Sequence, residues 1–199
     1  ITMAPPKMEP LPTGKYLVLL GVLAAHSVIG GYYAGTRPEG AGWRYFSWHP
    51  FLMMLGMVGM MGAAALTKKR MGYTNTKLHG IIAWLGMFLS GGGFYVIYQN
   101  KKKMGKDHFT TLHSWAGLAV LVGCSMAGLA GGVFLHPDFG VDKQNGIIRK
   151  AHKLMSRGLL MVAWLATLSG LQTLVGDDDV KTLVMFAAPM MAAAPFTLM

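Results

Sequence analysis

Long apolar stretches alternate with short polar breaks along almost the whole chain. Five of these stretches have roughly the 17–25 residues that an α-helix needs to cross about 30 Å of hydrocarbon. The breaks between them hold most of the lysines, arginines and acidic residues. The pattern predicts membrane-spanning helices at residues 16–33, 48–67, 78–98, 112–135 and 151–175.

The two ends of the chain show different patterns. Residues 181–199 are apolar but contain Pro189 and Pro195, so we expect a sixth span that is broken or cut short. Residues 1–14 are rich in proline and are predicted to form an extended tail. The rest, residues 15–199, is predicted to form one domain. The predicted fold class is an all-α integral membrane protein with six transmembrane helices.

The composition agrees with a membrane protein. Of the 199 residues, 53% are hydrophobic and 13% are charged, whereas a soluble domain carries about a quarter charged residues. The net charge of +10 comes from basic residues near the ends of the predicted spans, where they can contact anionic lipid headgroups. Aromatic and basic residues do not interleave as they do on RNA-binding surfaces, so nucleic acid is excluded as a partner.

The basic residues also predict an orientation. With six spans both termini lie on one face, and that face carries more lysine and arginine than the other. The positive-inside rule then directs the N-terminal face toward cytosol, matrix or stroma. Because the chain begins Ile1-Thr2-Met3, it is interpreted as a processed precursor or as part of a longer chain. A removed targeting segment favours an organellar membrane, mitochondrial or thylakoid, over the endomembrane system.

Four histidines, His49, His79, His113 and His152, each open a predicted span. Consecutive spans run in opposite directions, so His49 and His113 share one face while His79 and His152 share the other. In a four-helix core formed by residues 45–175, alternate helices can face each other. We therefore predict two bis-histidine sites, one near each membrane surface.

Two imidazoles on one haem iron leave no open coordination position, which suits electron transfer rather than oxygen chemistry. Ionisable residues inside spans are costly and are commonly functional. The alternative for any single histidine at a helix end is an interfacial residue hydrogen-bonded to water. We assign His26, His108 and His136 to interfacial or packing roles of that kind.

The segments around the four histidines resemble the haem motifs of the cytochrome b561 family. The similar segments are Phe46-Ser47-Trp48-His49-Pro50, Lys77-Leu78-His79-Gly80, Leu112-His113-Ser114-Trp115-Ala116-Gly117-Leu118, and Ala151-His152 with the later Leu168-Ser169-Gly170-Leu171. The resemblance covers roughly residues 45–175. It implies six helices, two b-type haems and transmembrane electron transfer, commonly from ascorbate to monodehydroascorbate or a ferric chelate.

The resemblance also implies a place for the reductant. Family members hold ascorbate with basic residues just before the third-helix histidine, and Lys77 matches that position. Arg149 could add a second charge from the loop before the fifth span. The basic run 68–70 is interpreted as a contact with lipid headgroups.

Three further residues are candidates near the haems. Arg44 and Arg157 lie close in sequence to His49 and His152, so they are candidate partners for haem propionates; snorkelling to the interface explains them about as well. Ser114 is a candidate hydrogen-bonding residue beside His113.

The opposite face departs from the family pattern. Gln99-Asn100 and Thr110 stand where members often have a His-Asn pair and a tyrosine, and the run of lysines at 101–103 is atypical. The usual acceptor therefore cannot be assumed for this chain.

Two functions of different classes follow from the sequence. The first is a di-haem, ascorbate-linked membrane oxidoreductase. The second is an accessory haem-binding or structural subunit of a larger organellar complex, respiratory or photosynthetic. Isolation with stoichiometric partners would favour the second, and an ascorbate-reducible homodimer would favour the first. A transporter ranks last, since the middles of the spans hold no Asp or Glu.

Overall fold

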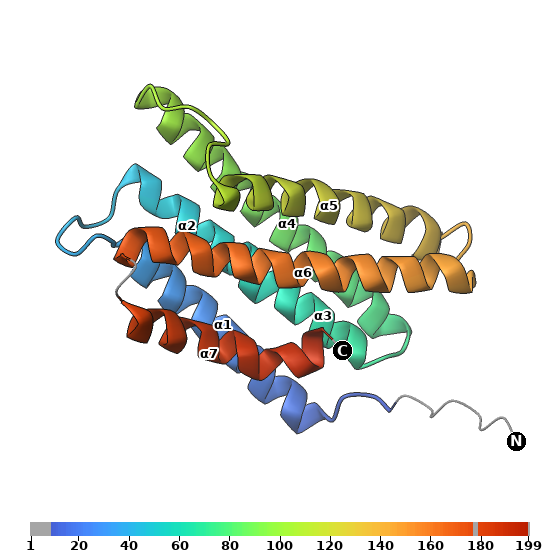
Figure 1. Ribbon diagram of the computed structural model, residues 1–199. Helices are drawn as coiled ribbons and strands as arrows, with labels where there is room; N and C mark the ends of the chain where they lie inside the picture. Colours follow the sequence, from blue (N-terminus) through green and yellow to red (C-terminus); the bar gives the residue numbers. More distant parts are fainter. Residues whose placement is uncertain (1–8, 177–178, 199) are drawn as a thin grey trace, which may run out of the picture.

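The computed structural model describes residues 9–176 and 179–198, and it contains helices and no β-strand among those residues (Figure 1). A 3₁₀-helix, Tyr45–Ser47, precedes α2, and a π-helical segment, Met54–Met60, joins α2 to α3. The α-helices are α1 (Thr13–Gly35), α2 (Trp48–Met53), α3 (Met61–Lys69), α4 (Tyr73–Lys103), α5 (Leu112–Leu135), α6 (Gly146–Val175) and α7 (Val180–Thr197).

The predicted membrane fold is confirmed. The segment Tyr45–Lys69 forms one span through α2, the π-helical segment and α3, so the described residues contain six helices long and apolar enough to cross a membrane. The start of α1 and the end of α7 lie at the same end of the bundle (Figure 1), as an even number of spans requires. Many large apolar side chains point outward, Phe88 and Leu112 for example with 73% and 86% exposure, as expected of surfaces that face lipid.

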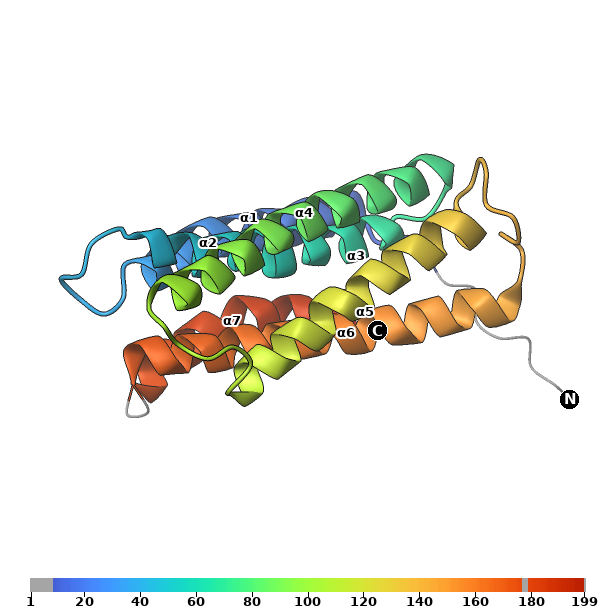
Figure 2. The same cartoon turned by 90° about the horizontal axis from the view of Figure 1, so that it is seen from above.

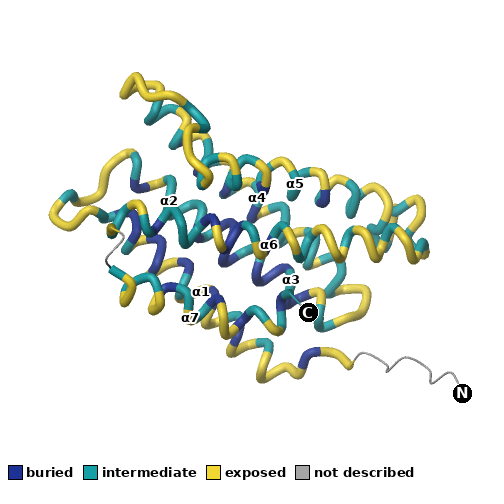
Figure 3. Tube along the Cα trace, viewed as in Figure 1, coloured by how far each residue is buried: buried dark blue, intermediate teal, exposed yellow. Residues whose placement is uncertain are grey.

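Two helices have starts that the hydrophobic pattern did not predict. α6 begins at Gly146, ahead of the predicted residue 151, because the Asn145 side chain accepts hydrogen bonds from the N–H groups of Ile147 and Ile148 at 2.9 and 3.1 Å. α4 begins at Tyr73 and continues through the lysines at 101–103 to a length of 31 residues. Its last turns extend beyond the bundle, and most of their residues are half-buried or exposed (Figure 3).

The expectation of a broken sixth span is wrong, because α7 is one continuous helix that contains both Pro189 and Pro195. Met190 and Ala193 of α7 are buried, and the helix packs against α1, α3 and α6. Contacts with neighbouring helices let a transmembrane helix tolerate the backbone donors that proline removes.

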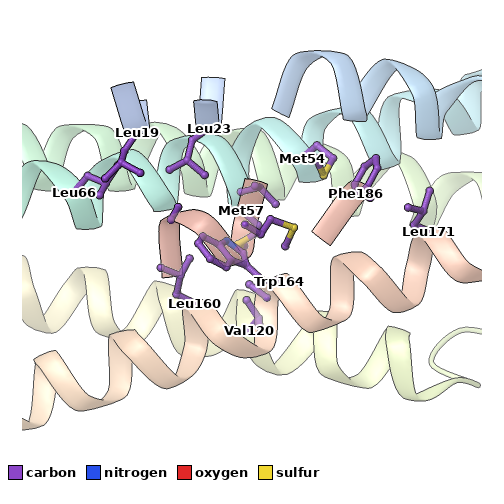
Figure 4. Packing of buried hydrophobic residues seen from close by; sticks show 14 of the residues in the cluster. Leu19, Leu23, Met54, Met57, Leu66, Val120, Leu160, Trp164, Leu171 and Phe186 are labelled. Atoms are coloured by element: carbon purple, nitrogen blue, oxygen red, sulfur yellow. The ribbon is translucent and has the colours of Figure 1, made fainter. Parts of the chain in front are cut away.

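The helices form two layers, seen from above in Figure 2, with α1, α2, α3 and α4 in one layer and α6 and α7 in the other. α5 belongs to the second layer and crosses toward α4 along its length. The buried side chains gather where the layers meet, and Trp164 of α6 lies among residues from both layers (Figure 4). Its neighbours in this cluster include Leu23, Met57, Val120 and Leu160.

Two glycines of the π-helical segment allow the first layer to pack closely. A Cβ on Gly56 would lie 2.1 Å from Ser90 Oγ of α4, and a Cβ on Gly59 would lie 2.6 Å from Ser27 Oγ of α1. Small residues commonly bring helices together in lipid, where the hydrophobic effect does not drive their association. The hydrophobic pattern of this span gave no indication of its π-helical geometry.

Residues 1–8 of the predicted N-terminal tail lie outside the described residues. The described end of the tail packs against the bundle: Leu11 is buried, its N–H donates to the Lys69 carbonyl at 3.0 Å, and the Arg70 guanidinium donates to the Leu11 carbonyl. α1 begins at Thr13, so the last residues of the predicted tail are helical.

Candidate functional site

His49 of α2 and His113 of α5 face each other at one end of the bundle. The centroids of their imidazole rings are 6.3 Å apart, and the ring planes are at 89°. His49 Nδ1 lies 3.0 Å from the Gly93 carbonyl oxygen, and His113 Nδ1 lies 2.9 Å from the Ala166 carbonyl oxygen. A carbonyl oxygen can only accept a hydrogen bond, so each Nδ1 carries the proton and each Nε2 keeps a lone pair for a metal.

A cavity of about 360 Å³ lies beside these two rings, and most of its wall is apolar. Two imidazoles that bind one metal from opposite sides have ring centroids roughly 6 Å apart, given about 2 Å for each metal–nitrogen bond. The observed separation of 6.3 Å, the unprotonated Nε2 atoms and the apolar wall fit a haem with two axial histidines.

The local sequence places His113 in the first turn of its helix. The Ser114 N–H donates to Thr111 Oγ1 at 3.2 Å and the Thr111 N–H donates to Ser114 Oγ at 3.1 Å, which is a reciprocal capping box at the start of α5. His49 is placed in a similar way, because Pro50 follows it in the first turn of α2, where proline suits a helix.

His79 of α4 and His152 of α6 lie together at the opposite end, close enough to interact electrostatically. His79 Nδ1 is 2.8 Å from the Ala64 carbonyl oxygen, so its Nε2 also keeps a lone pair. The His152 ring lies against α5, where a Cβ on Gly131 would be 3.0 Å from His152 Cε1. Across residues 9–176 and 179–198 there is no group of three or more histidine, cysteine or acidic side chains that could hold a metal ion. His49 with His113, and His79 with His152, thus form two pairs, and two is the number of axial positions of a haem iron.

Arg44 is not placed as the sequence suggested. Its guanidinium donates to the Arg37 carbonyl in the loop before α2, and it forms no part of the cavity wall. The cation in that wall is Lys101, from the extended end of α4. Proximity in sequence to His49 did not predict the position of the Arg44 side chain, because its guanidinium binds a backbone carbonyl of the same loop.

Ser114 lines the cavity, but its hydroxyl donates to the Thr111 carbonyl at 2.7 Å and serves the helix cap. The serine that approaches His113 is Ser169 of α6, whose Oγ lies 3.4 Å from Nδ1. The next residue, Gly170, is so close that a Cβ there would be 2.7 Å from His113 Cε1. Ser169 and Gly170 were missed as contacts, although they lie in the fourth segment that resembles the family.

Arg157 has a buried side-chain nitrogen, Nη2, with no hydrogen-bond partner among the described residues. Lys69 lies close enough to interact with it electrostatically. Burying a donor without an acceptor is costly, so this nitrogen fits an anionic group, such as a propionate of a haem bound by His152 on the same helix.

Lys68 was interpreted as a headgroup contact, but the structure brings it to the second histidine pair. It interacts electrostatically with His79, His152 and Arg149, and its Nζ donates to Thr76 Oγ1 at 2.7 Å. The tight turn between α3 and α4 brings it there, and a basic run in a sequence does not reveal such a position.

Lys77 forms an ion pair that the sequence did not predict. Its Nζ is 2.8 Å from Oδ2 of Asp138, and the Tyr73 hydroxyl donates to Oδ1. The hydrogen bond from Lys77, followed by that from Tyr73, lowers the pKa of Asp138 below its usual value, so the carboxylate is ionised at neutral pH. A single aspartate in the loop between α5 and α6 carries no signal for a partner on α4.

Comparisons with known proteins agree with this geometry. The model of the family described as eukaryotic cytochrome b561 matches residues 48–176. A transmembrane ascorbate-dependent reductase of Sus scrofa is 30% identical over 128 residues, which are 62% of this chain and 50% of that protein. The corresponding reductase of Mus musculus is 28% identical over 116 residues, 54% and 46% of the two chains.

A lysosomal membrane ascorbate-dependent ferrireductase of Bos taurus is 26% identical over 134 residues, 63% of this chain and 50% of that protein. The chain spans about half the length of the curated relatives it matches. Since the family model covers well over half of the chain, including all four histidines of the two pairs, this multi-pass membrane protein belongs to the eukaryotic cytochrome b561 family.

Proposed function

We propose that the protein transfers electrons across a membrane, from ascorbate or a similar small anionic reductant to an acceptor on the other face, with two b-type haems. The observation that carries this proposal is the His49–His113 pair, with rings 6.3 Å apart beside a largely apolar cavity. The relatives are ascorbate-dependent reductases, which supports ascorbate as the reductant.

Each histidine pair would hold one haem, His49 with His113 and His79 with His152. When bound, each haem iron would supply a one-electron carrier with no open coordination position. The chain fixes the orientation of the imidazoles through backbone carbonyls, since a hydrogen bond at Nδ1 aims the other ring nitrogen. The carbonyls that do so belong to Gly93, Ala166 and Ala64.

The charged groups near each pair have separate roles in this proposal. Arg157 would bind a propionate near His152, and Lys101 would take the corresponding place in the cavity wall near His113. Lys77 and Arg149 would attract the anionic reductant. Lys68, which interacts electrostatically with both Arg149 and His79, would add to the same positive field.

A reduced-minus-oxidised optical spectrum of the purified protein, with haem counted per chain, tests the proposal. Two low-spin b-type haems that ascorbate reduces are expected. A protein without haem, or with haem that dithionite reduces but ascorbate does not, would contradict it.

Replacing Lys77 by alanine is expected to slow reduction by ascorbate about twofold to fivefold, the upper part of the range for losing one exposed charge contact. The effect has two causes, because the variant loses the ammonium and leaves Asp138 as an unpaired negative charge on the same face. Stopped-flow absorbance at the haem band measures the rate. Lys106→Ala, on the opposite face, is the matched control, and an unchanged rate in Lys77→Ala would remove Lys77 from the binding site.

A second candidate function is an accessory subunit of a larger organellar assembly. The observation that favours it is the exposed end of α4, where the lysines at 101–103 and Lys106 extend beyond the bundle (Figures 1 and 3). Purification after mild solubilisation tests it: stoichiometric partners support a complex, and an ascorbate-reducible homodimer counts against one. A mitochondrial or thylakoid membrane remains the predicted location.

A further inference from the structure

The Lys77 ammonium, which we propose as a binding group for the reductant, already forms an ion pair with a carboxylate of this chain. Lys77 Nζ lies 2.8 Å from Oδ2 of Asp138, and it is also 3.4 Å from the Tyr73 hydroxyl. That hydroxyl donates to the other oxygen of Asp138, Oδ1. Two side chains at the start of α4 therefore hold both oxygens of one aspartate.

The loop between α5 and α6 fixes Asp138 in this place by its own contacts. The Asp138 N–H donates to His136 Nδ1 at 3.2 Å, and the His136 ring stacks on Phe139 with 3.7 Å between centroids. Lys143 Nζ donates to the Pro137 carbonyl at 2.9 Å. Because these contacts do not involve Lys77, the carboxylate would stay beside α4 when the ammonium binds something else.

Within the part of the chain that the structure describes, Asp138 is the acidic residue that forms an ion pair at this end of the molecule. Among the described residues, the ion pairs are Lys77–Asp138 at this end and Arg37–Glu39 in the loop between α1 and α2 at the opposite end. The other cations near the His79–His152 pair, Lys68 for example, bind neutral groups or lie beside further cations. An anion that approaches this face therefore meets mainly positive charge, and the carboxylate that is paired with one of the cations is Asp138.

The ion pair is accessible to a competitor. The side chains of Lys77 and Asp138 are 40% and 38% exposed, and exposed ion pairs are weak and screened by salt. Ascorbate at neutral pH is a monoanion, so it carries the same charge as the aspartate carboxylate. Both ligands would use the same donor, the Lys77 ammonium.

We propose that Asp138 competes with the anionic reductant for Lys77 and thereby sets how tightly this face binds reductant. This inference rests on the proposed function. Asp138 acts through Lys77, so it is a positioning residue rather than a catalytic one. A reductant without charge gains nothing from Lys77, and its reaction is independent of Asp138.

The test is Asp138→Asn in the full chain loaded with haem, followed by stopped-flow reduction at increasing concentrations of ascorbate. We expect the KM for ascorbate to fall about twofold to fivefold with kcat nearly unchanged, because the variant frees the ammonium and does not alter the electron carriers. The KM for an uncharged hydroquinone, duroquinol, is expected to stay the same. Asp138→Glu keeps the charge and should keep the wild-type KM.

Asp142→Asn is the matched control. Asp142 lies in the same loop and its Oδ2 accepts a hydrogen bond from Asn145 Nδ2 at 2.8 Å, so this variant removes the same charge from the same face without touching Lys77. Equal decreases of KM in the two variants would mean that net surface charge alone acts, and would overturn the proposal. An unchanged or raised KM in Asp138→Asn would overturn it as well.

The proposed function and the role of Asp138 can be overturned separately. Wild-type protein that dithionite reduces and ascorbate does not would overturn the proposed function, and this inference with it. Wild-type protein that ascorbate reduces, with no specific effect of Asp138→Asn, would overturn this inference alone.

Discussion

Replacing His113 by leucine is expected to remove one of the two proposed haems and to leave the other in place. His113 and His49 are the histidines whose rings face each other beside the cavity, 6.3 Å apart. Leucine supplies no axial nitrogen, and the remaining ligand cannot saturate the iron. The other pair, His79 and His152, lies at the opposite end of the bundle, where His79 is oriented by its own hydrogen bond to the Ala64 carbonyl, so it should keep its haem.

The measurement is haem per chain, with the low-spin absorption of each component resolved in a redox titration. His113→Leu should halve the haem content and remove one component, and His79→Leu should remove the other. His26→Leu is the control, because His26 of α1 packs against Phe186 of α7 and does not itself line the cavity. If His113→Leu and His79→Leu remove the same component, the pairing is wrong.

Replacing Gly170 by alanine is expected to weaken the same haem site although the ligands are unchanged. The added Cβ would lie 2.7 Å from His113 Cε1, a distance that forces the ring to move. The ring has little freedom, because its Nδ1 is bound to the Ala166 carbonyl at 2.9 Å and Ser169 lies at 3.4 Å. Overpacking of this kind costs about 1–3 kcal/mol, so haem retention at this site should weaken about tenfold.

Transfer of haem to an excess of apomyoglobin measures this retention, and the spin state reports whether the axial ligand is displaced. Gly158→Ala on the same helix is the control, since a Cβ there would meet nothing within 4 Å. Gly131→Ala should act on the other site and more mildly, because its Cβ would be 3.0 Å from His152 Cε1. Equal haem retention in Gly170→Ala and Gly158→Ala would contradict the fit of the cavity.

The membrane spans could be predicted from the sequence because the bilayer requires the same length and apolar character of all of them. A helix that crosses hydrocarbon must be apolar and about 20 residues long, and the predicted 112–135 coincides with α5. The helix ends were less predictable, since they depend on local polar contacts such as the Asn145 side chain at the start of α6. The continuity of α7 depends on packing against its neighbours, which a rule about proline does not include.

The histidine pairs were also predictable, because alternating direction in a bundle fixes which helix starts share a face. The groups around the histidines were not. Lys101 rather than Arg44 lies in the cavity wall, and Ser169 rather than Ser114 approaches His113. These contacts join side chains from different helices, and their distances depend on how deeply the helices pack.

The sequence by itself determined the membrane class, the six spans, the family motifs and the four histidines, since each is a periodic or short-range property of the chain. Only the tertiary structure decided which backbone carbonyls orient the imidazoles, which cations lie near the histidine pairs, and that Asp138 binds Lys77. The physical reason is that charges and hydrogen bonds act over a few ångströms in space, while the residues concerned are separated by whole transmembrane helices in the chain.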